Sequence, residues 1–223
     1  WGGRIIFPKL LGISTFILIH MLHLEILTSE QRDLFPFLKK FGKDFGLVGG
    51  TAIALQIGHR RSIDFDLFSQ KMFKGLLLER KVRRIVKVDE VLKNKESEFT
   101  FFTHKVKVTF FCYPFAVPYA ISLDGIIKMP DVLTIAAMKA FALGRRAKWK
   151  DYVDLYFVMR DHHNLNEIVN KAEKIFSSEF NEKTFRAQLA YFEDVDYTEE
   201  VIFMDGFETG DEIIKNKLIE FSL

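Results

Sequence analysis

The chain has 223 residues, enough for one medium-sized domain or two small ones. Its 48% hydrophobic and 28% charged residues are ordinary for a globular protein with its own core. The formal net charge of +2 excludes a protein that coats nucleic acid through a global positive field. Any contact with nucleic acid must therefore depend on a local basic cluster. The single cysteine, Cys112, excludes an internal disulfide and fits a reducing cytoplasm.

The N-terminal residues 10–22 form an apolar run that follows Arg4 and Lys9. The run is shorter than the roughly 20 residues of a membrane-spanning helix, and no small-residue cleavage site follows it. Because the chain begins with Trp1, we interpret residues 1–20 as a non-native or upstream segment and Met21 as the biological start. We therefore expect a cytoplasmic protein without stable membrane association; a signal peptide or membrane anchor is the alternative.

The first predicted helix begins at Thr28 or Ser29, either of which can cap it, with Gln31 in the first turn. Apolar residues at helical spacing continue over 34–41, and Gly42 ends the helix.

The stretch from Leu47 to Phe68 carries the most informative pattern. A short apolar run stops at Gly49-Gly50, as a buried strand would. A short helix is expected over 51–57, with Thr51 as its cap and Gly58 as its end. Residues 63–68 then alternate apolar and polar, which predicts a strand.

On that strand, Asp64 and Asp66 should share one face, opposite Ile63, Phe65 and Leu67. Two carboxylates so close repel each other unless a cation lies between them. Mg²⁺ is commonly held by one or two carboxylates together with substrate phosphates. We therefore expect Asp64 and Asp66 to bind Mg²⁺.

The Gly-Gly turn at the start of a helix offers backbone N–H groups and a positive dipole end to a phosphate. Gly49, Gly50 and Thr51 are accordingly the predicted triphosphate site, and Arg60 in the following basic loop would add positive charge.

The middle of the chain predicts a helix over 73–81 that buries Leu76, Leu77 and Leu78. Strands are expected over 83–88, 98–102 and 106–113, and a short extended piece over 121–128.

Helices dominate after Pro130. Asp131 should cap a helix that Gly144 ends, and further helices are expected over 147–160, 165–176, 182–192 and 211–221. Strands followed by helices indicate an α+β or mixed α/β fold. We expect one domain over 21–125 and a helical C-terminal domain over 126–223.

Residues 48–68, with Gly49-Gly50 followed by Asp64-x-Asp66, resemble the first motif of the nucleotidyltransferase superfamily. More narrowly, they resemble the AbiEii/AbiGii toxins, the toxin halves of bacterial abortive-infection toxin–antitoxin pairs. A second match lies over 133–156. The resemblance implies a nucleotidyltransferase-type mixed sheet, followed by a helical domain. It also implies a Mg²⁺-dependent enzyme that moves a nucleotidyl group from an NTP to an RNA such as tRNA, with a cognate antitoxin as partner.

The resemblance also places Lys139 near the nucleotide phosphates and adds Asp151 and Asp154 to the catalytic set, beside Asp64 and Asp66. From the residues alone, Lys139 could equally be an edge residue that reaches solvent, or a buried charge with an anionic partner. Asp154 could simply form a surface ion pair with Lys150, four residues earlier.

One residue departs from the superfamily pattern. Many nucleotidyltransferases carry a third carboxylate on a later strand, and here Thr109 stands in the corresponding place. Either Asp151 or Asp154 completes the site, or two carboxylates suffice, or the protein is an inactive module that pairs with an antitoxin.

A basic cluster, Arg145, Arg146, Lys148 and Lys150, lies between two predicted helices. It could clamp a triphosphate or an RNA backbone, or it could be a solvated loop. The histidines and Cys112 show no zinc-binding spacing.

Overall fold

The computed structural model of the protein describes residues 22–223. The interpretation of residues 1–20 and of Met21 as the start concerns residues outside that range. Within 22–223, no helix is both long enough and apolar enough to cross a membrane.

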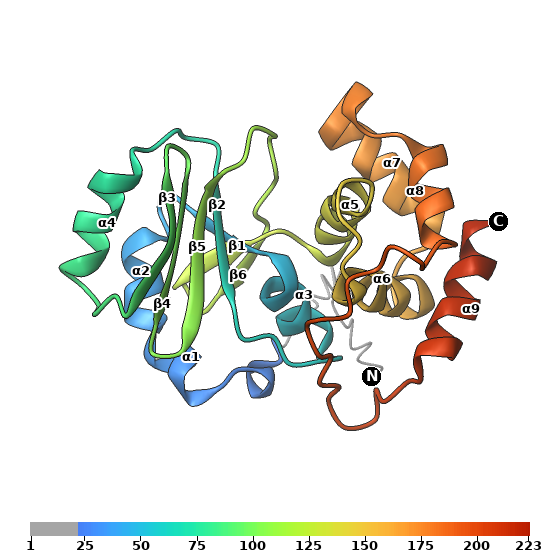
Figure 1. Cartoon of the computed structure of the whole chain (residues 1–223), viewed down its shortest axis with the longest axis horizontal. Coiled ribbons are helices and arrows are strands. Elements are labelled where there is room, and N and C mark those ends of the chain that lie inside the picture. The colour runs from blue at the N-terminus through green and yellow to red at the C-terminus, as the bar shows by residue number, and fades with distance from the viewer. Residues whose placement is uncertain (1–21) are drawn as a thin grey trace, which may run out of the picture.

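The described chain forms two lobes, one around a β-sheet and one of helices (Figure 1). The sheet has five strands in the order β1-β2-β5-β4-β3. They are β1 (Gly46–Val48), β2 (Phe65–Ser69), β3 (Glu90–Lys95), β4 (Glu98–Thr103) and β5 (Val106–Cys112). The β2–β5 pair is parallel and the other pairs are antiparallel, so the sheet is mixed, as predicted.

One face of the sheet is apolar and packs on α2 (Phe35–Phe41), which follows α1 (Ser29–Asp33). Thr28 caps α1 in a capping box with Gln31, as predicted. The rings of Phe41 on α2 and Phe110 on β5 lie 4.9 Å apart between centroids. Because side chains alternate along a strand, the neighbouring residue Thr109 faces the other way, and its register partner on β2 is Asp66. The opposite face of the sheet is therefore free to form a polar site.

Two expectations are wrong at and after the helix α4 (Gly75–Arg83): the burial of its leucines and the strand that should follow it. Leu78 and Val82 are buried at helical spacing, but Leu76 and Leu77 are 67% and 59% exposed. The strand expected over 83–88 is wrong: α4 runs to Arg83, and the β3 pairing begins at Glu90. After α4 the chain forms a turn and an irregular segment over 84–89, so the local β-branched residues did not decide the structure there.

The piece expected to be extended is a hairpin of β6 (Ile121–Leu123) and β7 (Ile127–Met129), and β7 contacts β1. Its turn uses Asp124 and Gly125, both with positive φ. The division predicted between 125 and 126 falls in this turn. We propose instead that the sheet lobe ends near Pro130.

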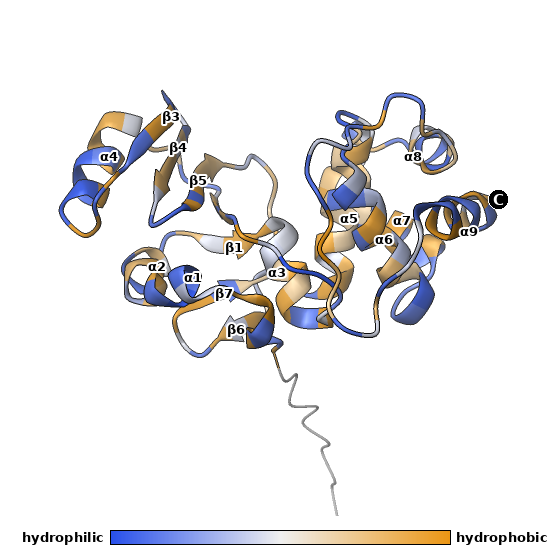
Figure 2. Ribbon diagram, turned by 60° about the horizontal axis from the view of Figure 1, so that its bottom comes forward, coloured by the Kyte–Doolittle hydropathy of each residue, from blue (hydrophilic) through white to orange (hydrophobic). Residues whose placement is uncertain are grey.

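The helical lobe contains α5 (Val132–Leu143), α6 (Trp149–Asp161), α7 (Leu165–Phe176), α8 (Glu182–Leu189) and α9 (Asp211–Ser222). The Asp131 side chain accepts a hydrogen bond from the Thr134 N–H at 2.7 Å and so caps α5, as predicted. Two short 3₁₀ helices lie at Leu24–Ile26 and Ser177–Glu179. Hydrophobic residues predominate along α3 (Gly49–Ile57) and α5, in the middle of the molecule (Figure 2).

Residues 190–210, which we call the strap, connect α8 to α9 without a helix or strand of their own. The strap passes α6 and the end of α3 (Figure 1). It is held by backbone hydrogen bonds near Asp196, which accepts from Trp149 N–H at 3.1 Å. It is held again near Ile202, whose carbonyl accepts from Arg61 N–H at 2.8 Å. The sequence did not predict that this segment returns to the sheet lobe.

Candidate active site

A pocket of about 550 Å³ lies between the polar face of the sheet and helices α5 and α6. Most of the predicted site residues line it: Gly49, Gly50, Arg60, Asp64, Asp66, Lys139 and Asp151. Residues from three distant parts of the sequence therefore meet at one place. Thr51 and Asp154 are not among the lining residues.

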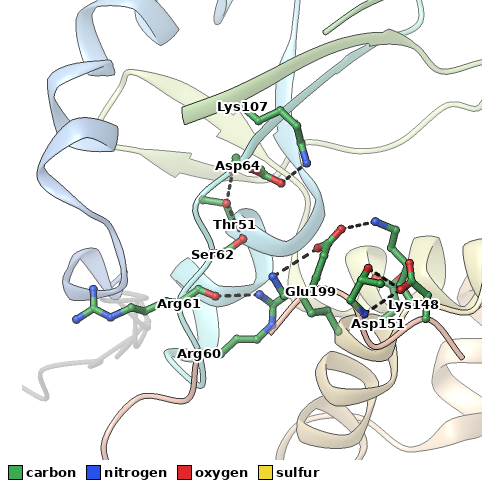
Figure 3. A network of polar contacts seen from close by, with 12 residues as sticks. Thr51, Arg60, Arg61, Ser62, Asp64, Lys107, Lys148, Asp151 and Glu199 are labelled. Carbon is green, nitrogen blue, oxygen red and sulfur yellow. Dashed lines mark hydrogen bonds and ion pairs between the residues drawn. The ribbon is translucent and has the colours of Figure 1, made fainter. Parts of the chain in front are cut away.

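Asp64 and Asp66 differ in their partners. Asp64 precedes β2 and forms an ion pair with Lys107 on β5 at 2.6 Å (Figure 3). No ion pair is recorded for Asp66 within 22–223. Burial, with the nearby Asp64 carboxylate second, raises the pKa of Asp66 to about 6. Burial alone would lower the pKa of Lys107, but its contact with Asp64 raises it. The pair therefore carries more negative charge than its protein partners neutralise.

The two glycines bring backbone close to these charges. Gly49 has φ +72°, and a Cβ there would collide with the Asp66 carboxylate. A Cβ on Gly50 would lie 2.7 Å from Arg60 Nη2. Val48 is the N-cap of α3, and no side chain caps the helix. The first N–H groups of α3 thus remain available to a ligand beside Asp66.

Thr51 corrects an expectation, because it does not cap α3. Its hydroxyl donates to the carbonyl of Asp64 and lies 2.9 Å from the Ser62 hydroxyl. The side chain is 1% exposed and faces the segment before β2 rather than the pocket. Thr51 therefore fixes the position of Asp64.

Asp154 lies at the centre of a buried ion network behind the pocket. Arg60 donates from Nε and Nη2 to its two oxygens, both at 2.7 Å. Lys139 Nζ and His59 Nε2 each lie 2.6 Å from it. Burial alone would raise the pKa of Asp154, but the charges of Arg60 and Lys139 hold it well below its usual range. The carboxylate is 0% exposed and has no face open to a metal ion.

Asp151, one turn earlier on α6, is placed differently. Its Oδ1 pairs with Lys139 at 2.6 Å, while Oδ2 makes no hydrogen bond to any described residue and lies 3.4 Å from Arg146. Burial alone would lower the pKa of Lys139, but Asp151 and Asp154 raise it. Lys139 is therefore a charged amine held at the pocket wall, the second of the two alternatives left open by the sequence.

The surface pair between Lys150 and Asp154 is not formed. Lys150 instead lies 3.4 Å from Glu199 of the strap, which also pairs with Lys148. Arg145 stacks over Phe141 at 3.6 Å from the ring centroid. The basic cluster therefore forms part of the pocket wall: all four of its side chains line the pocket.

Sequence reasoning missed Lys107 and Glu199. Lys107 could have been found, because it lies two residues before Thr109 and so shares its strand face. Glu199 gave no signal, since only the path of the strap brings it to the pocket.

The carboxylates at the sheet fit a Mg²⁺ site that substrate would complete. Within 22–223, no group of three or more His, Cys, Asp or Glu residues could hold a metal ion. Asp64 and Asp66 would supply two ligands, and Thr109 beside Asp66 supplies no carboxylate. Mg²⁺ held by two carboxylates plus phosphates and water is a common arrangement. Of the three alternatives raised by Thr109, a two-carboxylate site agrees best with this geometry.

One family model matches most of the chain, and one relative is similar over nearly its whole length. The model described as "Nucleotidyl transferase AbiEii toxin, Type IV TA system" matches residues 32–205. The protein aq_aa25 of Aquifex aeolicus is 32% identical over 209 residues, covering 87% of this chain and 97% of that protein.

Two solved structures have a similar fold. The nucleotidyltransferase toxin MenT4 of Mycobacterium tuberculosis has a TM-score of 0.55 at 14% identity, over 86% of this chain and 82% of that one. JHP933 of Helicobacter pylori has a TM-score of 0.50 at 15% identity, over 88% and 91%.

Proposed function

We propose a substrate and a cofactor on one premise: the chain belongs to the AbiEii family of nucleotidyl transferase toxins from type IV toxin–antitoxin systems. It is a nucleotidyltransferase with a nucleotide substrate and an antitoxin partner in its system. In our proposal, it acts in the cytoplasm and transfers NMP from an NTP to an RNA acceptor such as tRNA, with Mg²⁺ as cofactor.

The proposal rests on one observation: acidic and basic side chains line the same pocket. Asp66 lies against Gly49 at the start of α3, and Asp64 and Lys139 line the same pocket. Carboxylates alone would repel a triphosphate. Bound Mg²⁺ would neutralise the two carboxylates and would itself attract the phosphate oxygens.

Each side chain has a proposed role in binding the nucleotide. Asp64 and Asp66 would hold Mg²⁺, which when bound supplies charge neutralisation to the phosphates. The N–H groups after Gly49 would donate to a phosphate oxygen. Lys139 would offset the charge that develops on the departing pyrophosphate.

We assign a positioning role to three further residues, Asp151, Asp154 and Arg60. They would hold Lys139 in place rather than contact the substrate. Asp151 and Asp154 hold Lys139 from two sides, and Arg60 locks Asp154 in place. We propose that Asp154 is a positioning residue, which departs from its expected catalytic role. Asp151 lines the pocket and can also accept a hydrogen bond through Oδ2.

Transfer of a labelled nucleotide tests the proposal. The purified protein is incubated with each α-labelled NTP, Mg²⁺ and total tRNA, and label in RNA is measured. Label from at least one NTP is expected, and its loss with EDTA would show the metal dependence. A wild-type protein that labels no RNA and melts identically with and without Mg²⁺ and NTP would support the inactive binding module, the alternative that Thr109 suggested.

A further inference from the structure

An acidic side chain lies within the basic wall of the pocket. Glu199 pairs with both Lys148 and Lys150, and it lies between the α6 side of the pocket and the Asp64–Lys107 pair (Figure 3). Glu199 itself lines the pocket. Burial alone would raise the pKa of Glu199, but contact with Lys148 lowers it, so the group is a carboxylate at neutral pH.

The charge of Glu199 reaches further than its two direct partners. It favours the charged forms of both Lys107 and Arg60, on the sheet side of the pocket. A carboxylate among four cations occupies the kind of place that a phosphate group of a substrate would take.

We propose that Lys148 and Lys150 form a phosphate-binding subsite that Glu199 fills until substrate displaces it. The subsite would take a phosphate of the nucleotide or of the RNA acceptor, and this inference rests on the proposed function. Glu199 therefore lowers the affinity for that phosphate by competing for the two lysines.

The strap allows this exchange. Its backbone is held on either side of Glu199, by hydrogen bonds at Asp196 and at Ile202. The side chain of Glu199 has only exposed or partly exposed contacts, with 39% of its area accessible. It can therefore turn away from the lysines while the strap stays in place.

The substitution Glu199→Gln tests the proposal, with Glu200→Gln as the matched control. Glu200 carries the same charge one residue later, is exposed, and has no recorded ion pair or hydrogen bond within 22–223. Binding of a non-hydrolysable NTP with Mg²⁺ and of a short single-stranded RNA is measured separately by calorimetry at low salt. We expect Glu199→Gln to tighten one of the two by about two- to fivefold, because the variant loses a competing, partly exposed ion pair. Glu200→Gln should change neither.

A second variant identifies the lysine responsible. In the Glu199→Gln background, Lys148→Gln should remove the gain in affinity, because the freed lysine is its source. Melting temperatures should be nearly equal in all variants, since these pairs are partly exposed.

The ligand whose affinity rises identifies the phosphate that binds the Lys148–Lys150 subsite. A gain for the NTP analogue places the triphosphate in the subsite, and a gain for RNA places the acceptor backbone in it. Equal affinities of wild type and Glu199→Gln for both ligands would overturn the inference, as would an equal gain in Glu200→Gln. The transfer assay on wild type separately decides the proposed function, so a failure of one is not read as a failure of the other.

Discussion

The molecule holds two pairs of aspartates in similar sequence settings, and it uses them in opposite ways. Asp64 and Asp66 lie at the start of β2, where Lys107 pairs with Asp64, and the pKa of Asp66 rises to about 6. Asp151 and Asp154 lie on α6 among several cations, and the pKa of Asp154 falls well below its usual range. The neighbouring cations do not neutralise the Asp64–Asp66 pair, whereas they do neutralise the Asp151–Asp154 pair.

We propose that the supply of counter-charges, rather than the presence of carboxylates, separates the candidate metal site from the structural network. A carboxylate already saturated by Arg60 and Lys139 gains little from Mg²⁺ and would lose those contacts. A carboxylate that repels its neighbour gains from any cation. Four predictions test this contrast, in order of decreasing effect.

The largest effect is expected on catalysis. Asp64→Asn and Asp66→Asn should each reduce nucleotidyl transfer at least about 10³-fold, because each removes a ligand whose loss costs several kcal/mol of barrier. Both variants should stay folded, since Phe65 and Leu67 hold β2 in the core. Asp161→Asn, at the exposed end of α6, is the control and should leave transfer unchanged. Near wild-type activity of either sheet variant would contradict the assignment.

The next effect is on stability. Asp154→Asn should lower the free energy of unfolding by about 3–5 kcal/mol, because it leaves Arg60 and Lys139 buried without their shared partner. Asp161→Asn removes an exposed partner of Arg160 from the same helix and should cost about 0–1 kcal/mol. Urea unfolding of the three proteins provides the measurement. A loss as small as that of the control would show that the network does not hold α3 to α6.

The pH dependence of stability should differ between the pairs. Asp66 has a folded pKa of about 6 against an ordinary 3.8, so the folded state binds more protons in that interval. Metal-free stability should therefore fall as pH rises from about 4 to about 6, by up to about 3 kcal/mol. Asp154 has a lowered pKa, so its contribution is present above about pH 4 and is lost only in stronger acid.

The substitution Asp66→Asn separates the contribution of Asp66 to the pH dependence of stability from that of Asp154. With EDTA present, the variant should be more stable than wild type at pH 7. Its free energy of unfolding should not fall between pH 4 and pH 6, as that of wild type does. Chemical unfolding at pH 4.5 and pH 7 is sufficient. A variant less stable than wild type at pH 7 would mean that the Asp66 carboxylate is stabilised rather than repelled.

The smallest effect concerns RNA. Arg145→Glu with Arg146→Glu should flatten the dependence of log affinity for RNA on log salt by about one to two, because phosphate contacts are lost. Arg80→Glu with Arg84→Glu makes the same charge change on α4 and at its C-cap, and serves as control because neither arginine lines the active-site pocket. An unchanged slope in the first variant would show that Arg145 and Arg146 do not contact RNA phosphates.

The sequence predicted those parts of the fold that local patterns determine. The Asp131 cap, the end of α5 and the Thr28–Gln31 capping box depend on residues within one turn of each other. The period of a strand correctly places Asp66 opposite Phe65 and Leu67. Asp64 and Ile63, however, precede β2, and Ile63, which was expected on the buried face, is 52% exposed and lines the pocket. Leu76 and Leu77 were misplaced because a run of three leucines does not reveal which side of a helix the rest of the chain covers.

Sequence reasoning named most of its candidate residues from the pocket lining, but it missed Lys107 and Glu199 and did not predict how the residues are grouped. The spacing of Asp151 and Asp154 put both on one face of α6, yet the partners of Asp154 come from residues 94 and 95 positions earlier. The burial of Asp154 therefore depends on how the lobes pack. Glu199 reaches the pocket only through the hydrogen bonds of the strap, which no local pattern encodes.

Binding of Mn²⁺, a spectroscopic substitute for Mg²⁺, tests the central claim most directly. Free Mn²⁺ is followed by electron paramagnetic resonance at pH 7.5 during titration into wild type, Asp66→Asn and Asp151→Asn, each without nucleotide. The contrast between the two pairs predicts binding by wild type and Asp151→Asn, and its loss in Asp66→Asn. Retention of the ion by Asp66→Asn together with its loss in Asp151→Asn would place the metal at α6 and contradict the account.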